Sequence, residues 1–320
     1  MRMQVLNLDG GVLGQDQFME AHRPEVVDLR TWGPKLRMGC SFRAFREFER
    51  DLARMLPRDN DAPTLNFIGS GDFHHVSLAL TRRLREPAVL LILDHHPDWM
   101  VGVPFLHCGT WVQHALKSTC VERIIHLGGE TDFDNAFRWM APRRAILDGR
   151  ITVVPGRREF QRGFWSGIPQ ERLTDPVDHR LTDRRLAKLV DMLLPLVANR
   201  AVYVSLDKDV LRPEEAAVNW DSGVMRLTDA MRILAALEEQ CEARIVGMDI
   251  VGDWSPVKMS GLFRRGLHWL EHEPDAMDAD RARKINEETN SCLADFLRNL
   301  TRFSNWQRKS SEEKFAAPSV

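Results

Sequence analysis

The sequence predicts an α/β protein in which helices cover both faces of a central, mainly parallel sheet. Short, continuous apolar runs predict strands at Gln4–Leu8, Thr64–Ile68, Val89–Leu93, Arg123–Leu127, Ile151–Val154, Ala201–Leu206 and Arg244–Ile250. Amphipathic stretches between them predict helices at Phe42–Leu56, Val76–Leu84, Gly109–Lys117, Leu181–Val197 and Thr228–Gln240. Strands that are apolar on both faces and alternate with helices are typical of parallel sheets enclosed in a three-layer α/β/α arrangement.

The domain organisation follows from composition and length. The 320 residues contain 43% hydrophobic side chains and no shift in composition that would indicate a linker. We therefore expect one domain over residues 1–308, with an irregular surface segment at Gly156–Asp178 and a long helix from Asp275. Residues 309–320 are polar, and we expect a flexible tail there.

Charge and cysteine content exclude several classes of protein. A net charge of −2 gives no general attraction to nucleic acid or to anionic membranes. Five scattered cysteines without a CxxC pair argue against a disulfide framework or a zinc ribbon. The first residues, MRMQVLNLDGG, lack the long apolar core of a signal peptide, and no stretch of about 18 apolar residues exists that would span a bilayer. We expect a cytoplasmic protein.

Three predicted strands end in unusual polar clusters, namely FIGSGDFHH (67–75), LILDHHPDW (91–99) and YVSLDKDVL (203–211). Ligands of parallel sheets bind beyond the carboxyl ends of the strands. Side chains on extended backbone alternate with a period of two, so Asp94, His96 and Asp98 should share one face, opposite His95. Asp207 and Asp209 have the same spacing, and the first cluster can add an imidazole from His74 or His75.

Metal binding explains these clusters better than local capping does. A single aspartate at a strand end is usually a cap or turn residue, whereas three clusters with matched spacing indicate a metal site. Four carboxylates can neutralise two divalent cations, and an oxygen-rich set with imidazole and no thiolate suits Mn²⁺ better than structural Zn²⁺. Two such ions can activate a shared water at neutral pH. In contrast, His126 is expected to be a core histidine.

With these motifs the sequence resembles the arginase/agmatinase family of ureohydrolases. The resemblance covers residues 64–256, and its motifs occur in the order typical of that family. The matching stretches are GSGDFHH, Asp94-His95-His96-Pro97-Asp98, His107-Cys108-Gly109-Thr110, Ser205-Leu206-Asp207-Lys208-Asp209 and Asp249-Ile250-Val251-Gly252-Asp253. The resemblance implies an arginase-like fold, two Mn²⁺ ions per chain and hydrolysis of a guanidino group.

The resemblance also implies roles for individual residues. Asp94 and Asp207 would bridge the two metals. Asp98 and a loop histidine would complete one metal, for which the following Ser-Leu-Ala favours His75 over His74. His96 and Asp209 would complete the other metal. His107 would lie near the substrate and transfer a proton.

Two departures from the family bear on the substrate. The family glutamate that holds the guanidinium falls on Gly252, so we expect its neighbour Asp253 to take that role. The polar residues with which arginases bind a free α-carboxylate are replaced by the apolar stretch Trp99–Phe105. An apolar wall cannot compensate a buried carboxylate. This pattern resembles the atypical peptide arginases of ribosomal peptide natural-product pathways, which convert arginine in a precursor peptide to ornithine.

The sequence therefore predicts a metal-dependent hydrolase in which Asp209, His107 and Asp253 assist catalysis. Trp99, Trp220 and Trp254 are candidates to contact the guanidinium or the peptide, although packing would explain such residues equally well. Three alternatives remain: hydrolysis of agmatine or another small guanidino compound, a one-metal amide deacetylase, and a non-catalytic binding protein. We expect no nucleic-acid or membrane partner, and the chain could form a homo-oligomer.

Overall fold

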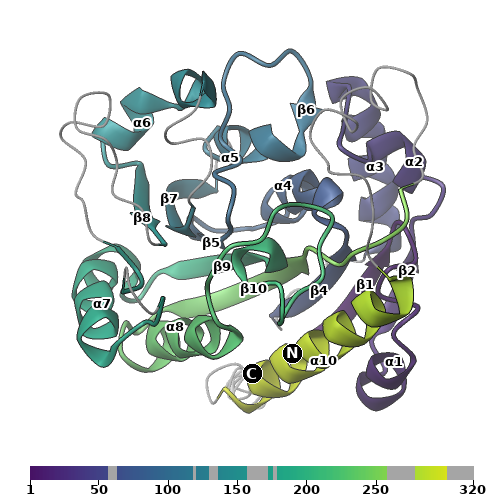
Figure 1. Cartoon of the computed structure of the whole chain (residues 1–320). Helices are drawn as coiled ribbons and strands as arrows, with labels where there is room; N and C mark the ends of the chain where they lie inside the picture. Colours follow the sequence, from purple (N-terminus) through teal and green to yellow (C-terminus); the bar gives the residue numbers. More distant parts are fainter. Residues whose placement is uncertain are drawn as a thin grey trace, which may run out of the picture.

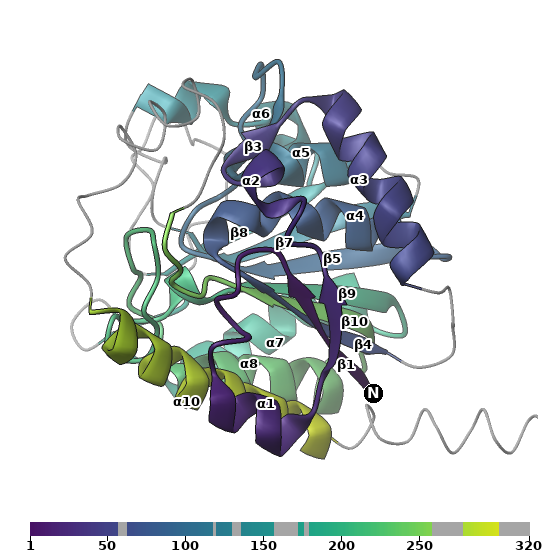
Figure 2. The same ribbon diagram turned by 90° about the vertical axis from the view of Figure 1, so that its right-hand side faces the viewer.

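The structure, a computed structural model, describes residues 1–56, 63–117, 120–129, 136–156, 172–175, 179–257 and 278–300. A central sheet separates two layers of helices (Figure 1). One face is covered by α2 (Gly33–Leu36), α3 (Phe42–Met55), α4 (Ser77–Thr81), α5 (Trp111–Ala115) and α6 (Arg143–Leu147). The other face is covered by α1 (Asp16–His22), α7 (Asp183–Val197), α8 (Leu227–Glu239) and α10 (Ala279–Asn299), as Figure 2 shows from the side.

The central sheet has eight strands in the order β2-β1-β4-β10-β9-β5-β7-β8. Every pairing within it is parallel. The strands are β1 (Arg2–Asn7), β2 (Glu25–Asp28), β4 (Thr64–Gly69), β5 (Ala88–Leu93), β7 (Val121–Gly128), β8 (Ile151–Pro155), β9 (Ala201–Asp207) and β10 (Arg244–Val251). A small antiparallel pair, β3 (Gly39–Cys40) with β6 (Leu106–His107), lies apart from this sheet.

The apolar runs of the strands supply two hydrophobic cores, one on each face. All six residues of β5 are buried, and their side chains alternate between the cores. Leu91 and Leu93 pack with residues of α7, α8 and α10, whereas Leu90 and Ile92 pack with residues of α3, α4 and α5. Each buried Leu or Ile side chain contributes about 1.5–3 kcal/mol. This two-sided burial holds the central strands rigid and fixes the ends that carry polar residues.

The helix ends follow from local sequence. Ser41 caps α3 by accepting a hydrogen bond from the backbone N–H of Ala44, and Thr182 caps α7 in the same way through Arg185. Asp278 caps α10 through Asp280. Short 3-10 helices follow the strands that carry the polar clusters or lie in the loops between them, namely η1 (Gly71–Val76), η2 (Cys108–Thr110), η3 (Ala136–Met140) and η4 (Lys208–Val210).

The predicted fold class is confirmed, and each of the seven predicted strands forms a strand of the sheet. The predictions missed β2, whose EVVD sequence is largely exposed, and the two-residue strands β3 and β6. They also missed the short helices α1, α2 and α6. Most of Gly156–Asp178 and the tail at 309–320 lie outside the described residues, so the expected boundary at residue 308 stays a prediction. None of the described helices has the length and apolar content needed to cross a membrane.

Candidate metal centre

The three polar clusters meet at the carboxyl edge of the sheet. The turn after β4 continues into η1, the chain after β5 carries residues 94–98, and the turn after β9 forms η4. β9 lies between β5 and β10, and β10 lies beside β4, so the three strand ends are close neighbours. Two groups of metal-ligating side chains form there: His74 with Asp94 and Asp98, and Asp94 with His96 and Asp209.

The first group surrounds one ring nitrogen of His74. Its Nδ1 lies 3.2 Å from Asp94 Oδ2, 3.0 Å from Asp98 Oδ2 and 3.4 Å from Asp207 Oδ2. All four side chains are buried. One N–H cannot donate to three carboxylates at once, so this geometry is that of a ligand set and not of an ordinary ion pair.

The other ring nitrogen of His74 fixes which atom faces the carboxylates. His74 Nε2 lies 2.9 Å from Ser205 Oγ, and that hydroxyl donates a 2.7 Å hydrogen bond to Asp249 Oδ1. A hydroxyl has a single proton, so Ser205 must accept from Nε2–H. Nδ1 then faces three carboxylate oxygens, and only a proton or a metal cation between them removes the repulsion. Such a histidine–hydroxyl–carboxylate relay is the support that metal-binding imidazoles require.

The second group is centred on Asp209. His96 Nδ1 lies 2.7 Å from Asp209 Oδ2, and the other oxygen, Oδ1, accepts the backbone N–H of His95 at 3.0 Å. Asp94 belongs to both groups of possible ligands. Its Oδ1 also accepts the backbone N–H of His96 at 2.7 Å. Asp207 connects to this group because its Oδ1 accepts the N–H of Asp209 at 3.0 Å.

The buried carboxylates of this centre need positive charge to compensate them, as the shifts in their pKa values show. Burial and the charge of Asp209 raise the pKa of Asp94 well above its usual range, and the same causes raise the pKa of Asp207 to about 8. Burial disfavours the imidazolium of His74, but its hydrogen bonds to Asp94 and Asp98 raise its pKa well above 6.5. Without metal, protons therefore carry the compensating charge, and metal ions would displace them.

The donor set fits two divalent cations. His74, Asp94, Asp98 and Asp207 would hold one, and Asp94, His96, Asp207 and Asp209 the other. Carboxylate and imidazole donors without thiolate suit a metal such as Mn²⁺.

Neighbouring residues hold Asp98 in an unusual backbone conformation. Asp98 has a φ of +49°, in the left-handed region, where the chain leaves the extended geometry assumed from the strand. The indole Nε1–H of Trp111 donates a 2.8 Å hydrogen bond to Asp98 Oδ2. His126 is buried in the core as expected, and its Nε2 lies 2.8 Å from the carbonyl oxygen of His96, whereas its Nδ1 has no hydrogen-bond partner among the described residues.

Two glycines let the backbone approach the centre closely. A Cβ on Gly252 would lie 2.4 Å from Asp207 Oδ1, and its φ is +97°. A Cβ on Gly71 would lie 3.2 Å from both Asp207 Oδ2 and the Trp220 ring. No side chain fits at Gly252 while Asp207 holds this position, so an acidic side chain could not approach the centre from residue 252.

Two predicted site residues have other positions. The sequence favoured His75 as the loop ligand, but His74 faces the carboxylates and His75 lies beside Phe45 in the core, with ring centroids 6.2 Å apart. Asp253 was expected to hold the guanidinium, but it is fully buried and its Oδ1 accepts a 2.8 Å hydrogen bond from Lys208 Nζ. The expectation that Asp253, one residue after Gly252, holds the guanidinium was wrong, because its side chain is used to compensate the charge of Lys208.

Of the predicted tryptophans and His107, two residues are buried and two are half-buried. Trp99 is fully buried in a hydrophobic core, so it cannot contact substrate as proposed. Trp220 is half-buried, with its ring 5.4 Å from that of His96, and Trp254 is half-buried as well. His107 Nδ1 accepts the backbone N–H of Gly109 at 3.0 Å. His107 immediately precedes η2, which packs against η1, and its role in proton transfer stays a prediction.

Sequence reasoning missed several supporting residues. Asp221 lies 3.1 Å from His96 Nε2 and 3.6 Å from His95 Nε2, so His95 faces the same side as His96 and not the opposite side. The period of two failed because β5 ends at Leu93, before these residues. Asp221 follows no strand, and no spacing signal in the sequence pointed to it. Only its proximity in space reveals it.

A second network that the sequence did not reveal is a set of buried hydrogen bonds between Lys208 of η4 and α10. Lys208 Nζ also contacts Asn286 Oδ1 at 3.3 Å and Asn290 Oδ1 at 3.0 Å, both on α10. Asp253 Oδ1 additionally accepts a 2.6 Å bond from Gln15 Nε2. The Lys208 side chain thus points toward α10 and Asp253, away from the ligands on either side of it. The buried ion pair thus connects the Asp207–Asp209 turn to the C-terminal helix.

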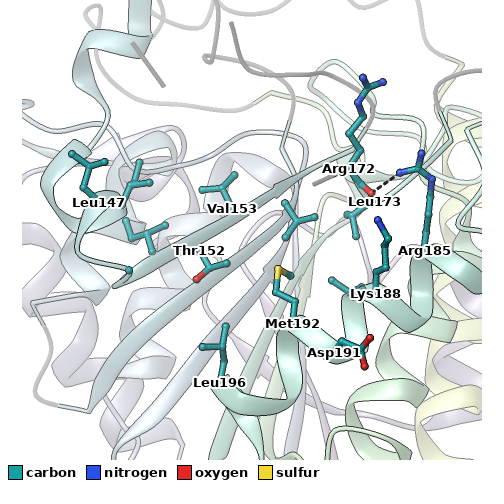
Figure 3. Close-up of a pocket in the computed structure, with 15 residues that line it drawn as sticks. Leu147, Thr152, Val153, Arg172, Leu173, Arg185, Lys188, Asp191, Met192 and Leu196 are labelled. Carbon is teal, nitrogen blue, oxygen red and sulfur yellow. Dashed lines mark hydrogen bonds between the residues drawn. The ribbon is translucent and has the colours of Figure 1, made fainter. Parts of the chain in front are cut away.

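A separate groove runs along the outer edge of β8, between α6 and α7 (Figure 3). Its volume is about 610 Å³, and its walls are mostly apolar, with Leu147, Val153 and Met192 among them. Arg185 donates a 3.0 Å hydrogen bond to the carbonyl oxygen of Arg172 at one end, as Figure 3 shows. Its described lining includes none of the metal-ligating residues.

Comparisons with known proteins agree with this geometry. A sequence model of the arginase family matches residues 67–256. An uncharacterized protein of Thermotoga maritima is 24% identical over 220 residues, which cover 64% of this chain and 70% of that protein. Proclavaminate amidino hydrolase from Streptomyces clavuligerus superposes with a TM-score of 0.53 at 16% identity, over 93% of this chain and 92% of that one. Agmatine ureohydrolase of Thermoplasma volcanium superposes with a TM-score of 0.51 at 15% identity, over 96% of this chain and 90% of that one.

Proposed function

Because the chain belongs to the arginase family, it is a hydrolase of carbon–nitrogen bonds in linear amidines, and we propose that it acts on arginine side chains within a peptide. Water adds to the guanidinium carbon, the bond from that carbon to Nε breaks, and urea and an ornithine side chain are formed. The observation that carries this proposal is the donor set of His74, Asp94, Asp98, His96, Asp207 and Asp209 at one edge of the sheet.

We propose Mn²⁺ as the metal. When bound, a pair of such ions supplies an activated water and polarises the group under attack. The residues of the chain do the remaining work. Asp94 and Asp207 carry the charge shared by the two sites, and Ser205 holds the His74 ring in the orientation that directs Nδ1 toward them. His107 is our candidate for protonating the amine that leaves.

Recognition of the guanidinium cation requires groups other than the buried Asp253. Trp220 lies beside Gly71 and Asp207, and its indole Nε1–H donates a 3.1 Å bond to Asp72 Oδ1, which fixes the ring. A ring face in this place can bind a guanidinium by cation–π attraction. Asp221, whose side chain is 65% exposed, adds a negative charge beside it. Trp220 and Asp221 are therefore the cation-binding residues in this proposal.

A peptide substrate is favoured by the loop that follows Asp98. Met100, Val101, Val103 and Phe105 are half-buried and apolar, so a free α-carboxylate would find no partner among them. In a peptide this carboxylate is replaced by a neutral amide. Agmatine is the second candidate, because it also lacks a carboxylate and the same apolar loop would suit it.

The test is urea release from the Mn²⁺-loaded protein with three substrates: free arginine, agmatine, and an arginine peptide blocked at both ends. We expect urea from the peptide, together with a mass loss of CN₂H₂ for each arginine converted. Urea from agmatine but not from the peptide would replace the proposal with the second candidate. No urea from any of the three would contradict guanidine hydrolysis.

A further inference from the structure

The loop after Asp98 is connected to a second apolar surface on η3. The backbone N–H of Val101 donates a 2.8 Å hydrogen bond to the carbonyl oxygen of Met140, the last residue of η3. Met100 is held on the other side, since its N–H bonds to the carbonyl oxygen of Gly109 at 2.9 Å. The loop therefore lies between η3 and the segment that carries His107.

Large apolar side chains on η3 are exposed to solvent. Phe137 is 47% exposed and Trp139 is 68% exposed, the highest value for a large apolar residue in the described part of the chain. The guanidinium of Arg138 lies 5.5 Å from the centre of the Trp139 ring. Phe137 and Trp139 are two positions apart on η3, and aromatic side chains are enriched at surfaces that bind another molecule.

Distance along the chain places this surface within reach of a peptide bound at the metal centre. Val101 is three positions after Asp98, a span of at most about 11 Å, and its backbone N–H is bonded to Met140. Trp139 is the next residue. An extended peptide advances about 3.3 Å per residue, so about five residues on one side of a reacting arginine would reach η3.

We propose that Phe137 and Trp139, which we name the aromatic shelf, bind the apolar residues that flank the reacting arginine of a peptide substrate. This inference rests on the proposed peptide substrate and deepens it. The chain between Asp98 and the hydrogen bond to Met140 carries two half-buried apolar side chains, Met100 and Val101. Arg138 places a positive charge on the shelf, so a basic flank is disfavoured and an apolar or acidic one is accepted.

The experiment compares two blocked peptides with the Mn²⁺-loaded full-length chain. One carries leucine and phenylalanine at the five positions on either side of a single arginine, and the other carries glycine and serine there. We expect the double variant Phe137→Ser/Trp139→Ser to raise KM about tenfold for the apolar peptide, the scale of effect that loss of aromatic contacts produces. Its kcat should not change, and neither should KM for the glycine–serine peptide.

Met55→Ser is the matched control. Met55 is 46% exposed, almost the same fraction as Phe137. It is the last residue of α3, which leads to the amino end of β4 at the opposite edge of the sheet. This variant should leave both peptides unaffected. An unchanged KM in the double variant, or an equal loss with both peptides, would overturn the shelf. A concentration-dependent dimer that the double variant abolishes would also overturn it, because the shelf would then bind a second copy.

A binding assay distinguishes failure of the proposed hydrolysis from failure of the shelf. If the parent protein hydrolyses neither peptide, binding of a fluorescein-labelled apolar peptide with glutamine in place of arginine still decides the inference by fluorescence anisotropy. Weaker binding to the double variant than to Met55→Ser supports the shelf, and equal binding refutes it.

Discussion

Replacing Ser205 by alanine should damage one metal site selectively. The Ser205 hydroxyl accepts from His74 Nε2 at 2.9 Å and donates to Asp249 Oδ1 at 2.7 Å, and all three side chains are buried. Ser205→Ala leaves the Nε2–H without an acceptor and the ring free to turn. Loss of such a supporting contact typically lowers metal affinity 10–100-fold, or about 1.4–2.7 kcal/mol.

Ser77→Ala separates this effect from general destabilisation. Ser77 Oγ donates to the same oxygen, Asp249 Oδ1, at 3.0 Å, but the Ser77 hydroxyl makes no hydrogen bond with the His74 imidazole among the described contacts. Both variants should lose about 1–3 kcal/mol of unfolding free energy, since each removes a donor from a buried carboxylate. Only Ser205→Ala should weaken metal binding.

The assay is calorimetric titration of the metal-depleted protein with Mn²⁺. For Ser205→Ala we expect one of two binding steps to weaken, while the step that belongs to His96 and Asp209 keeps its affinity. Equal Mn²⁺ affinities in Ser205→Ala and Ser77→Ala would refute the argument that Ser205 directs His74 toward the metal.

Three further predictions concern the surroundings of the centre. Asp221→Asn removes the charge beside His96 Nε2 and beside Trp220, so KM for the substrate should rise about tenfold, while Asp191→Asn, which removes an exposed carboxylate on α7 beside the separate groove, leaves KM unchanged. Asp253→Asn should lower the unfolding free energy by about 3–5 kcal/mol, because it leaves Lys208 charged and uncompensated at 0% exposure; a raised KM with unchanged stability would instead return the guanidinium role to Asp253. Between pH 4 and about 8 the folded, metal-free protein keeps a proton on Asp207 that the unfolded chain has lost, so its denaturation midpoint in urea should fall as pH rises, and Mn²⁺ should abolish the decline.

The sequence predicted the sheet well because its central strands are apolar on both faces, and this pattern needs no tertiary information. The same pattern placed Asp94 and Asp207 together, since parallel strands bring their carboxyl ends to one edge. The choice between His74 and His75 could not be made in this way. The residues form a 3-10 helix, in which a one-residue change turns the side chain by about 120°, and family spacing gave the wrong residue.

The fate of Asp253 shows a different limit. Its role depends on Lys208, Gln15 and Asn290, which are distant in sequence and meet only after α10 packs below β9 and β10. No local pattern reports such a contact. Likewise, Trp99 stood in an apolar run that fits a substrate wall and a core equally well, and burial decided for the core.

The central claim is that two metal ions held by this donor set hydrolyse a guanidinium. It is tested most directly by measuring urea release from the blocked arginine peptide while Mn²⁺ is added back to metal-depleted protein and the bound metal is counted per chain. We predict that activity rises with occupancy and reaches its maximum at two ions per chain. Full activity without bound metal, or a protein that binds two ions and releases no urea from any guanidino substrate, would contradict the account.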